Sequence, residues 1–127
     1  MAIFEDADPQ QHAVKTADAA LGLLAATVAL NETHGPERLA VHIGINSGPA
    51  LVGSTRFEGP SGARWTFTAS GSVTNLAARL AGVAGEGQIV AGPETVRRLG
   101  ERYRLERLGR ERLKNISDAI DLYRILG

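Results

Sequence analysis

A long apolar stripe marks the first quarter of the chain. Small and apolar side chains recur there every three or four residues, which is the spacing of one buried helix face. They are Val14, Ala17, Leu21, Leu24 and Val28. Asp8 and Pro9 suit the cap and the first position of a helix, and Gly35, followed by a proline, suits its end. The pattern predicts one long helix over residues 9–33.

The remainder of the chain carries shorter patterns. Apolar alternation or β-branched and aromatic content predicts strands at 39–47, 64–68, 88–91, 103–108 and 120–126. Residues 50–53 are expected to return as a hairpin partner of the first of these strands, and 54–63 to form a polar loop. Helices are predicted from about residue 72 to 84 and from 93 to 99, each ended by glycine. Met1–Phe4 is typical of the end of a strand.

Hairpins mixed with helices predict an α+β fold. The order is (β)-α-β-β-β-α-β-α-β-β, with the helices expected on one face of a largely antiparallel sheet. The 127 residues suit one domain over 1–127, with no internal repeat or linker.

Composition narrows the function classes. Lys plus Arg and Asp plus Glu each number 14, so the formal net charge is zero. A nucleic-acid or membrane-surface protein would show a basic excess, so neither partner is expected. We expect no membrane-spanning segment and no signal peptide. A cytoplasmic location is therefore expected, either for the chain by itself or for the chain as part of a longer signalling protein. The chain has no cysteine, which excludes disulfides and thiolate chemistry.

One polar pair stands out on the second predicted helix. Asn75 and Arg79 lie one turn apart, on the side away from an apolar stripe. That stripe consists of Val73, Leu76, Ala77 and Leu80. Both polar side chains donate hydrogen bonds and Arg79 adds permanent charge, which suits an anionic, oxygen-rich target. The alternative is an ordinary solvated helix face.

Acidic residues gather just before the long helix. Glu5, Asp6 and Asp8 could cap that helix and favour its dipole, or they could bind a metal ion. Asp is common at helix caps, so capping is the favoured interpretation and no metal ligand is assigned.

Five segments in order resemble the class III nucleotide cyclases, the catalytic domain of adenylate and guanylate cyclases. They are residues 41–49, 67–71, 73–80, 85–90 and 113–114. The resemblance covers essentially the whole chain and implies a ferredoxin-like βαββαβ core with extra C-terminal strands, truncated at its N-terminus.

The resemblance also implies a reaction and a site. The family converts a nucleoside triphosphate into a cyclic nucleotide and pyrophosphate, in sites formed between two cyclase domains. By motif position, Asn75 orients the ribose, Arg79 stabilises charge on the phosphates, and Lys114 binds the triphosphate. Thr68 stands where the family reads the purine, which favours ATP over GTP. The expected partner is a second cyclase domain, as in a homodimer.

The metal-binding part of the family pattern has no counterpart in this sequence. The resemblance places the first family strand and the two metal aspartates ahead of Met1. Mg²⁺ or Mn²⁺ is expected in the complete family site, but this chain alone is expected to bind no metal and to be inactive. Three hypotheses follow: a fragment of an adenylate cyclase, a non-catalytic dimerisation or regulatory module, and a half-site donor to a metal-bearing partner domain.

Overall fold

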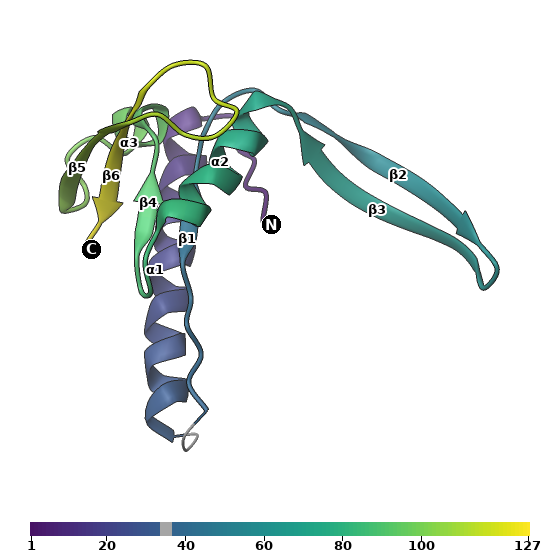
Figure 1. The fold of residues 1–127 in the computed structure, drawn as a ribbon, viewed down its shortest axis with the longest axis horizontal. Coiled ribbons are helices and arrows are strands. Elements are labelled where there is room, and N and C mark those ends of the chain that lie inside the picture. The colour runs from purple at the N-terminus through teal and green to yellow at the C-terminus, as the bar shows by residue number, and fades with distance from the viewer. Residues whose placement is uncertain (34–36) are drawn as a thin grey trace.

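A computed structural model describes residues 1–33 and 37–127, and the side chains at 51, 52, 55, 57 and 64–70 lie outside that description. Three helices and six strands appear in the described part (Figure 1). In chain order they are α1 (Pro9–Thr33), β1 (Ile43–Ile45), β2 (Leu51–Gly59), β3 (Gly62–Ser70), α2 (Ser72–Val83), β4 (Ile89–Ala91), α3 (Pro93–Leu99), β5 (Leu105–Glu111) and β6 (Ile120–Ile125).

Four of the strands form the central sheet, in the order β1-β4-β6-β5. β1 runs parallel to β4, with Ile43 beside Ile89, while the other two pairs are antiparallel. A parallel pair needs a crossover connection, and the long β2–β3 excursion with α2 supplies it. The mixed, mostly antiparallel sheet with three helices confirms the α+β class.

Both faces of this sheet carry helices, in place of the single covered face that the sequence predicts. α1 and α3 pack on the face presented by Ile45 and Ile89. α2 packs on the opposite face, where its Leu80 contacts the cluster that contains Val90. Neighbouring residues of a strand point to opposite faces, so the continuous apolar run from Ile89 to Ala91 serves two cores at once. All three residues of β4 are accordingly buried.

A glycine lets α2 lie directly against β1. A Cβ atom on Gly44 would stand 2.3 Å from the amide nitrogen of Ala81 and 2.4 Å from the carbonyl oxygen of Ala77. Both of these are backbone atoms of α2, so the helix could not keep its position beside any larger residue. Gly44 is therefore required by packing.

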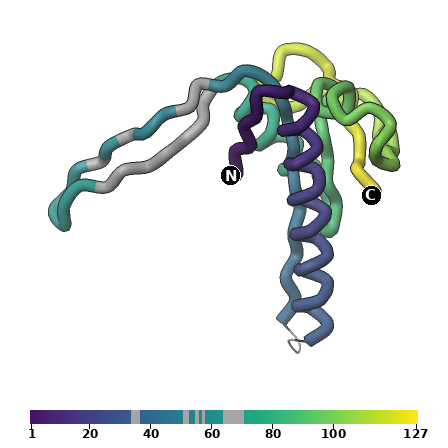
Figure 2. The backbone as a smooth tube through the Cα atoms, turned by 180° about the vertical axis from the view of Figure 1, so that it is seen from behind, coloured from purple at the N-terminus to yellow at the C-terminus, as the bar shows by residue number. Residues whose placement is uncertain are grey.

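The hairpin β2–β3 stands away from the rest of the molecule (Figures 1 and 2). Its two strands pair in antiparallel register over nine positions, from Leu51 opposite Ser70 to Gly59 opposite Gly62. The prediction that 50–53 pairs with the preceding strand is therefore wrong, as is the predicted loop at 54–63. The described side chains of β2, those of Ser54, Arg56 and Glu58, are exposed.

Helix α1 begins and runs as the sequence predicts. Asp8 caps it, because its Oδ1 accepts a hydrogen bond from the amide of Gln10 at 3.0 Å. The predicted stop at Gly35 and Pro36 lies outside the described residues. Contrary to expectation, α1 is long and apolar enough, by length and composition alone, to cross a membrane. Its alanines raise that hydropathy, and its first half packs on the sheet and on α3 through Ala13, Ala17 and Ala20.

The C-terminal strands confirm two predictions and correct one. β6 matches the predicted last strand, and β5 overlaps the predicted 103–108. The turn expected at 109–112 is instead strand, because β5 continues to Glu111 after a shift in register between Arg107 and Gly109. Asp121 on β6 accepts hydrogen bonds from Arg107 and Arg110 across this irregular part of the pair.

Candidate nucleotide-binding site

Helix α2 carries the candidate pair on its outer side. The helix begins directly after Gly71, whose φ of 114° is a conformation that favours glycine. Leu80 is fully buried against the sheet and Leu76 packs beside it. Asn75 is exposed and Arg79 is half-buried, one helical turn further along the same side. The structure thus places these two side chains where helical spacing predicts them.

The first turn of α2 is fixed by a side chain that sequence reasoning missed. Asn46, the residue after β1, donates a hydrogen bond from its Nδ2 to the carbonyl oxygen of Val73 at 3.0 Å. The next residue, Ser47, lies 2.8 Å from the buried hydroxyl of Thr95 in α3. The end of β1 therefore ties α2 to α3. The signal in the sequence that could have indicated this role is the pair of polar residues directly after an apolar strand.

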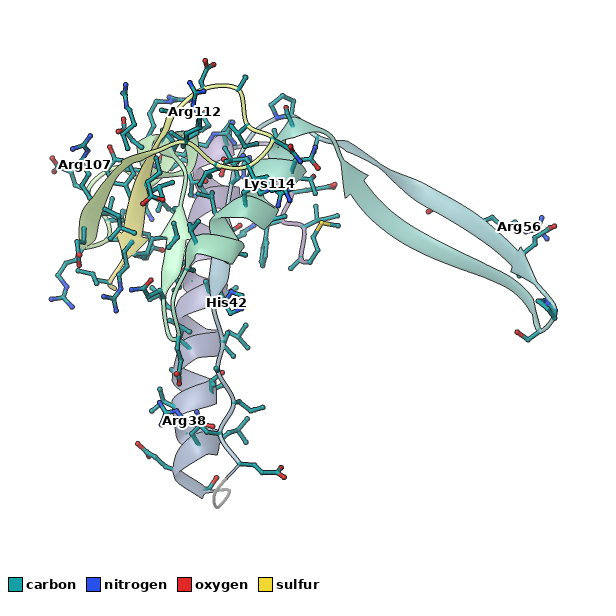
Figure 3. All side chains as sticks on the ribbon, viewed as in Figure 1. Arg38, His42, Arg56, Arg107, Arg112 and Lys114 are labelled. Carbon is teal, nitrogen blue, oxygen red and sulfur yellow. The ribbon has the colours of Figure 1, made fainter. Side chains whose placement is uncertain are left out.

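Lys114 reaches the same region through its neighbour in the sequence. Leu113 is 6% exposed and packs in one cluster with Leu80 of α2. A tight turn follows, in which the amide of Ile116 donates to the Leu113 carbonyl at 3.1 Å and Asn115 takes a φ of 63°. Figure 3 shows the exposed Lys114 beside α2. Packing of Leu113 thus holds a cation close to the helix that carries Arg79.

Within the described part of the chain, the side chains of Asn75, Arg79 and Lys114 make no hydrogen bond or ion pair. Other cations do find anions: Arg97 and Arg98 both bind Glu94, and their hydrogen bonds lower the pKa of that carboxyl to about 2. Two cations and an amide that pair with no other described side chain, on α2 and on the segment that packs against it, are a suitable arrangement for an anionic ligand.

The fourth predicted residue, Thr68, lies on β3, two residues before that strand ends. Its backbone pairs with Gly53 of β2. Its side chain lies outside the described residues, so its predicted contact with a purine remains a prediction. β3 leads directly into α2, which brings this strand end close to Asn75 in sequence and in space.

The acidic residues before α1 do not fit a metal pair. Asp6 accepts a hydrogen bond from Lys15 at 2.6 Å, which is the main cause of its lowered pKa, and Asp8 is the helix cap. No group of three His, Asp or Glu side chains gathers in a metal-binding arrangement among residues 1–33 and 37–127. A divalent metal needs several converging oxygen ligands, and the described residues do not supply such a set.

A cavity of about 320 Å³ lies on the opposite side of α2 from Arg79. It is bounded by the N-terminal segment Met1–Phe4, by β1 and its continuation, and by the small residues of α2, among them Ala77 and Ala81. Because Arg79 and Lys114 are not among its lining residues, this cavity is separate from the candidate nucleotide-binding residues.

Fold and polar residues together define an α+β domain whose second helix, α2, carries an exposed amide and a half-buried guanidinium on its outer side. The sequence profile of the adenylate and guanylate cyclase catalytic domain matches residues 1–127. The chain therefore belongs to this family, as the motifs in its sequence predict. A comparison with curated protein sequences finds no match.

Solved structures of cyclase domains share the fold. The adenylyl cyclase CyaB from P. aeruginosa is 22% identical, with a TM-score of 0.84 over 98% of this chain and 65% of that one. The guanylate cyclase domain of RhGC from Catenaria anguillulae, solved with GTP, is 22% identical, with a TM-score of 0.76 over 91% of this chain and 60% of that one. The guanylyl cyclase Cya2 is 22% identical, with a TM-score of 0.78 and coverages of 93% and 59%. This chain thus spans about 59–65% of these cyclase chains.

Proposed function

We propose that this domain contributes one half of a nucleotide cyclase site, binding the phosphates of a nucleoside triphosphate through Arg79 and Lys114 and its ribose through Asn75. The observation that carries the proposal is the half-buried Arg79, which lies one turn from Asn75 and pairs with no anion in the described part of the chain. Leu113, the neighbour of Lys114, packs in one cluster with Leu80 of the same helix. A fixed guanidinium that is left without an internal partner is available for charge on a ligand.

The proposed roles follow from the chemistry of cyclisation. The ribose 3′-oxygen attacks the α-phosphorus, the 3′ proton is lost, and pyrophosphate leaves. Negative charge builds on the oxygens of the α-phosphate and of the leaving group, so preorganised donors stabilise the transition state more than the ground state. Arg79 supplies such donors from a rigid helix. Asn75 would hold the ribose in line, and Lys114 would bind the terminal phosphates.

The proposed substrate is ATP. Thr68 occupies the motif position where the family reads the purine, and a hydroxyl at that position goes with adenine in the family pattern. The solved neighbours do not decide this point, since they include an adenylyl cyclase and two guanylyl cyclases.

The proposed half-site needs a second domain. The described residues do not form the ligand set of a divalent metal, and we infer that the carboxylates of the complete site come from a partner domain. The chain alone is accordingly expected to be inactive, and a metal-bearing cyclase domain paired with it would complete the site.

A complementation assay tests this function. The purified chain is mixed with a cyclase domain that keeps its metal carboxylates but lacks its own transition-state arginine, and cyclic AMP is measured with Mg²⁺ or Mn²⁺. We expect no product from the chain alone and product from the mixture. Arg79→Ala should lower that rate about 100-fold, the usual cost of one transition-state donor. Arg112→Ala is the matched control, since this arginine is exposed and lies just before Lys114.

Two results would reject the half-site. Cyclic AMP above background from the chain alone would show that it holds its own metals. Equal rates for Arg79→Ala and Arg112→Ala in the mixture would remove Arg79 from the site. In the second case the domain would be a non-catalytic dimerisation or regulatory module, a role favoured by the hairpin β2–β3, which projects from the body of the molecule (Figure 1).

A further inference from the structure

The first turn of α2 has little support within the helix itself. Its cap position is Gly71, which offers no side chain to the free amides of the helix start, and the turn contains no acidic residue. Helix ends without such caps tend to fray. Asn75 lies at the end of this turn, and its amide donates to the Gly71 carbonyl at 3.0 Å. The turn that carries the proposed ribose ligand therefore depends on contacts from outside the helix.

The segment that follows β1 supplies such contacts, and they meet at Val73. Asn46 donates a hydrogen bond from its Nδ2 to the Val73 carbonyl oxygen at 3.0 Å. Gly48 adds a close packing contact, because a Cβ atom there would stand 2.9 Å from Cγ2 of Val73. Val73 lies two residues before Asn75 in the same turn. Residues 46–48 thus hold both the carbonyl group and the side chain of Val73.

Asn46 is itself held in a defined position. Gly92, directly after β4, leaves room for its side chain, because a Cβ atom at position 92 would stand 3.0 Å from Oδ1 of Asn46. The Gly92 amide donates to the Ile45 carbonyl at 3.2 Å, which fixes the backbone just before Asn46. On the other side of Asn46 in the sequence, the Ser47 hydroxyl lies 2.8 Å from that of the fully buried Thr95. The donor that meets α2 is therefore supported by the sheet and by α3.

We propose that Asn46 is a positioning residue of the half-site, which holds the first turn of α2 so that Asn75 meets the ribose in the right orientation. This inference rests on the proposed function, since it concerns the same site. Asn46 lines the cavity from which Arg79 is absent, so it acts through the helix and does not touch the nucleotide. Its hydrogen bond keeps the turn in place before the ligand arrives, so the turn need not become ordered during the reaction.

Two kinetic signatures separate this role from a general role in folding. In the proposed site Arg79 and Lys114 bind the phosphates independently of the first turn, so the loss of Asn46 should lower kcat and leave KM nearly unchanged. A residue that acts through Asn75 also has nothing left to position once the Asn75 side chain is removed. The losses caused by substituting Asn46 and Asn75 should therefore not add.

Asn46→Asp tests the role with almost no change in shape, because it replaces the donor by an acceptor that faces the Val73 carbonyl oxygen. In the mixture with the metal-bearing cyclase domain, we expect kcat to fall about tenfold or more and KM for ATP to stay within about twofold. In the Asn75→Ala background the same substitution should change the rate by less than about twofold. Asn46→Ala should give the same pattern, and it takes the place of Asn46→Asp if the added charge disturbs folding.

Asn31→Asp is the matched control. It makes the same exchange at an amide that donates to a backbone carbonyl, that of Leu39, on the far part of α1. The two sites share no partner, so kcat and KM should both stay within about twofold of the parent values.

Amide hydrogen exchange gives a measurement that needs neither a partner domain nor a nucleotide. The Asn75 amide should exchange about tenfold faster in both Asn46 variants than in the parent chain or in Asn31→Asp, because the first turn opens more often. Unchanged exchange in both Asn46 variants would overturn the inference, as would a loss of rate that adds to that of Asn75→Ala, and either result leaves the half-site standing. Absence of product from the parent mixture would instead reject the half-site, and the positioning role with it, whatever the exchange rates are.

Discussion

The two outer strands of the central sheet differ in how their free edges are protected. At one end, β5 carries two glutamates and two arginines, its register with β6 shifts at Arg107/Gly109, and Arg107 binds Asp121 across the pair. At the other end, β1 is three residues long, is centred on Gly44, and has no charged side chain. Charges and irregular register discourage a further strand, whereas a short, uncharged edge permits one. The β5 end is therefore protected as an edge, whereas the three residues of β1 carry no such protection.

The inner sides of the two ends differ as well. At the β1 end, α2 lies so close that only glycine fits at position 44. At the β5 end, the chain is anchored through polar side chains, with Tyr103 reaching the first half of α1. A close backbone approach holds the β1 end, whereas polar side chains add to the apolar packing at the β5 end. The effects of substitutions at the two ends are therefore expected to differ in size.

The largest effect is expected at the β1 end. Gly44→Ala would push its Cβ into backbone atoms of α2, and neither helix nor strand can yield without losing its own core contacts. We expect unfolding free energy to fall by about 3 kcal/mol, the upper part of the range for overpacking. Urea denaturation measures it. Gly22→Ala in α1 is the control, because its Cβ would meet nothing within 4 Å and should stabilise the helix by about 0.5–1 kcal/mol. Equal midpoints for the two variants would contradict the close approach.

The next effect belongs to the β5 end. The Tyr103 hydroxyl donates a hydrogen bond to the Asp18 carboxylate at 2.5 Å and lies 3.3 Å from the Val14 carbonyl oxygen. Tyr103→Phe should therefore lower the free energy of unfolding by about 1.5 kcal/mol, the usual value for a hydrogen bond to a charged group. Burial and then Asp18 raise the pKa of Tyr103 to about 12. A raised pKa stabilises the fold fully below the ordinary value of 10 and less as the pH rises towards 12.

The two predictions for Tyr103 are checked together by denaturation at neutral and alkaline pH. The difference in unfolding free energy between the parent chain and Tyr103→Phe should disappear as the pH rises from 10 towards 12. Asp18→Asn is the control: it keeps an acceptor for the hydroxyl but removes the charge, so it should cost less at neutral pH. A gap that is constant with pH would argue against the contact.

A smaller effect is expected where the chain leads into β1. The side-chain amide of Asn31 accepts a hydrogen bond from the backbone N–H of Leu39 at 2.8 Å and donates one to the Leu39 carbonyl oxygen at 2.9 Å. These two hydrogen bonds hold residues 37–42 beside α1. Asn31→Ala should lower stability by about 1 kcal/mol, because the lost bonds outweigh the gain in helix propensity. Asn31→Asp keeps the acceptor and should lose less. Exchange of the Leu39 amide reports the contact directly, and an unchanged rate in Asn31→Ala would count against it.

Sequence patterns identified those elements whose signals are local. The spacing of apolar residues in α1 and the glycine and proline around α3 were sufficient to place both helices. The partner of β2 could not be found in this way, because its pairing with β3 is a contact between two strands and not a pattern within either one. The second covered face of the sheet also escaped prediction, since it depends on the parallel pairing of Ile43 with Ile89, which no local pattern encodes.

The residues of the candidate site also differ in whether a local sequence pattern predicts them. Asn75 and Arg79 follow from helical spacing alone. The position of Lys114 depends on Leu113 packing against Leu80, so only the family motif could indicate it. Asn46 was missed because its role is a hydrogen bond to the Val73 carbonyl, a contact across 27 residues. Long-range contacts of this kind become visible only in the folded chain.

The smallest effect is expected from Asp121→Asn, which leaves the β5 edge without its central anion. Asp121 binds Arg107 at 2.9 Å and Arg110 at 3.4 Å, but both arginines are well exposed, and exposed ion pairs contribute little. Hydrogen bonds from Arg110 and then Arg107 lower the pKa of Asp121 below its ordinary 3.8. A lowered pKa stabilises the fold fully above that ordinary value, and the contribution disappears as the pH falls through the lower, folded value.

Denaturation should therefore show a small difference in unfolding free energy between the parent chain and Asp121→Asn at neutral pH, and this difference should become smaller in acid and with added salt. Asp118→Asn, at an exposed acid in the preceding loop, is the control and should show no such gap. Self-association should be unchanged in both variants, because the irregular register of β5 remains after the charge is removed. If Asp121→Asn instead made the chain associate through β5, the charge of Asp121, and not the irregular register, would be what protects that edge. The difference between the β5 and β1 edges would then depend on this one carboxylate.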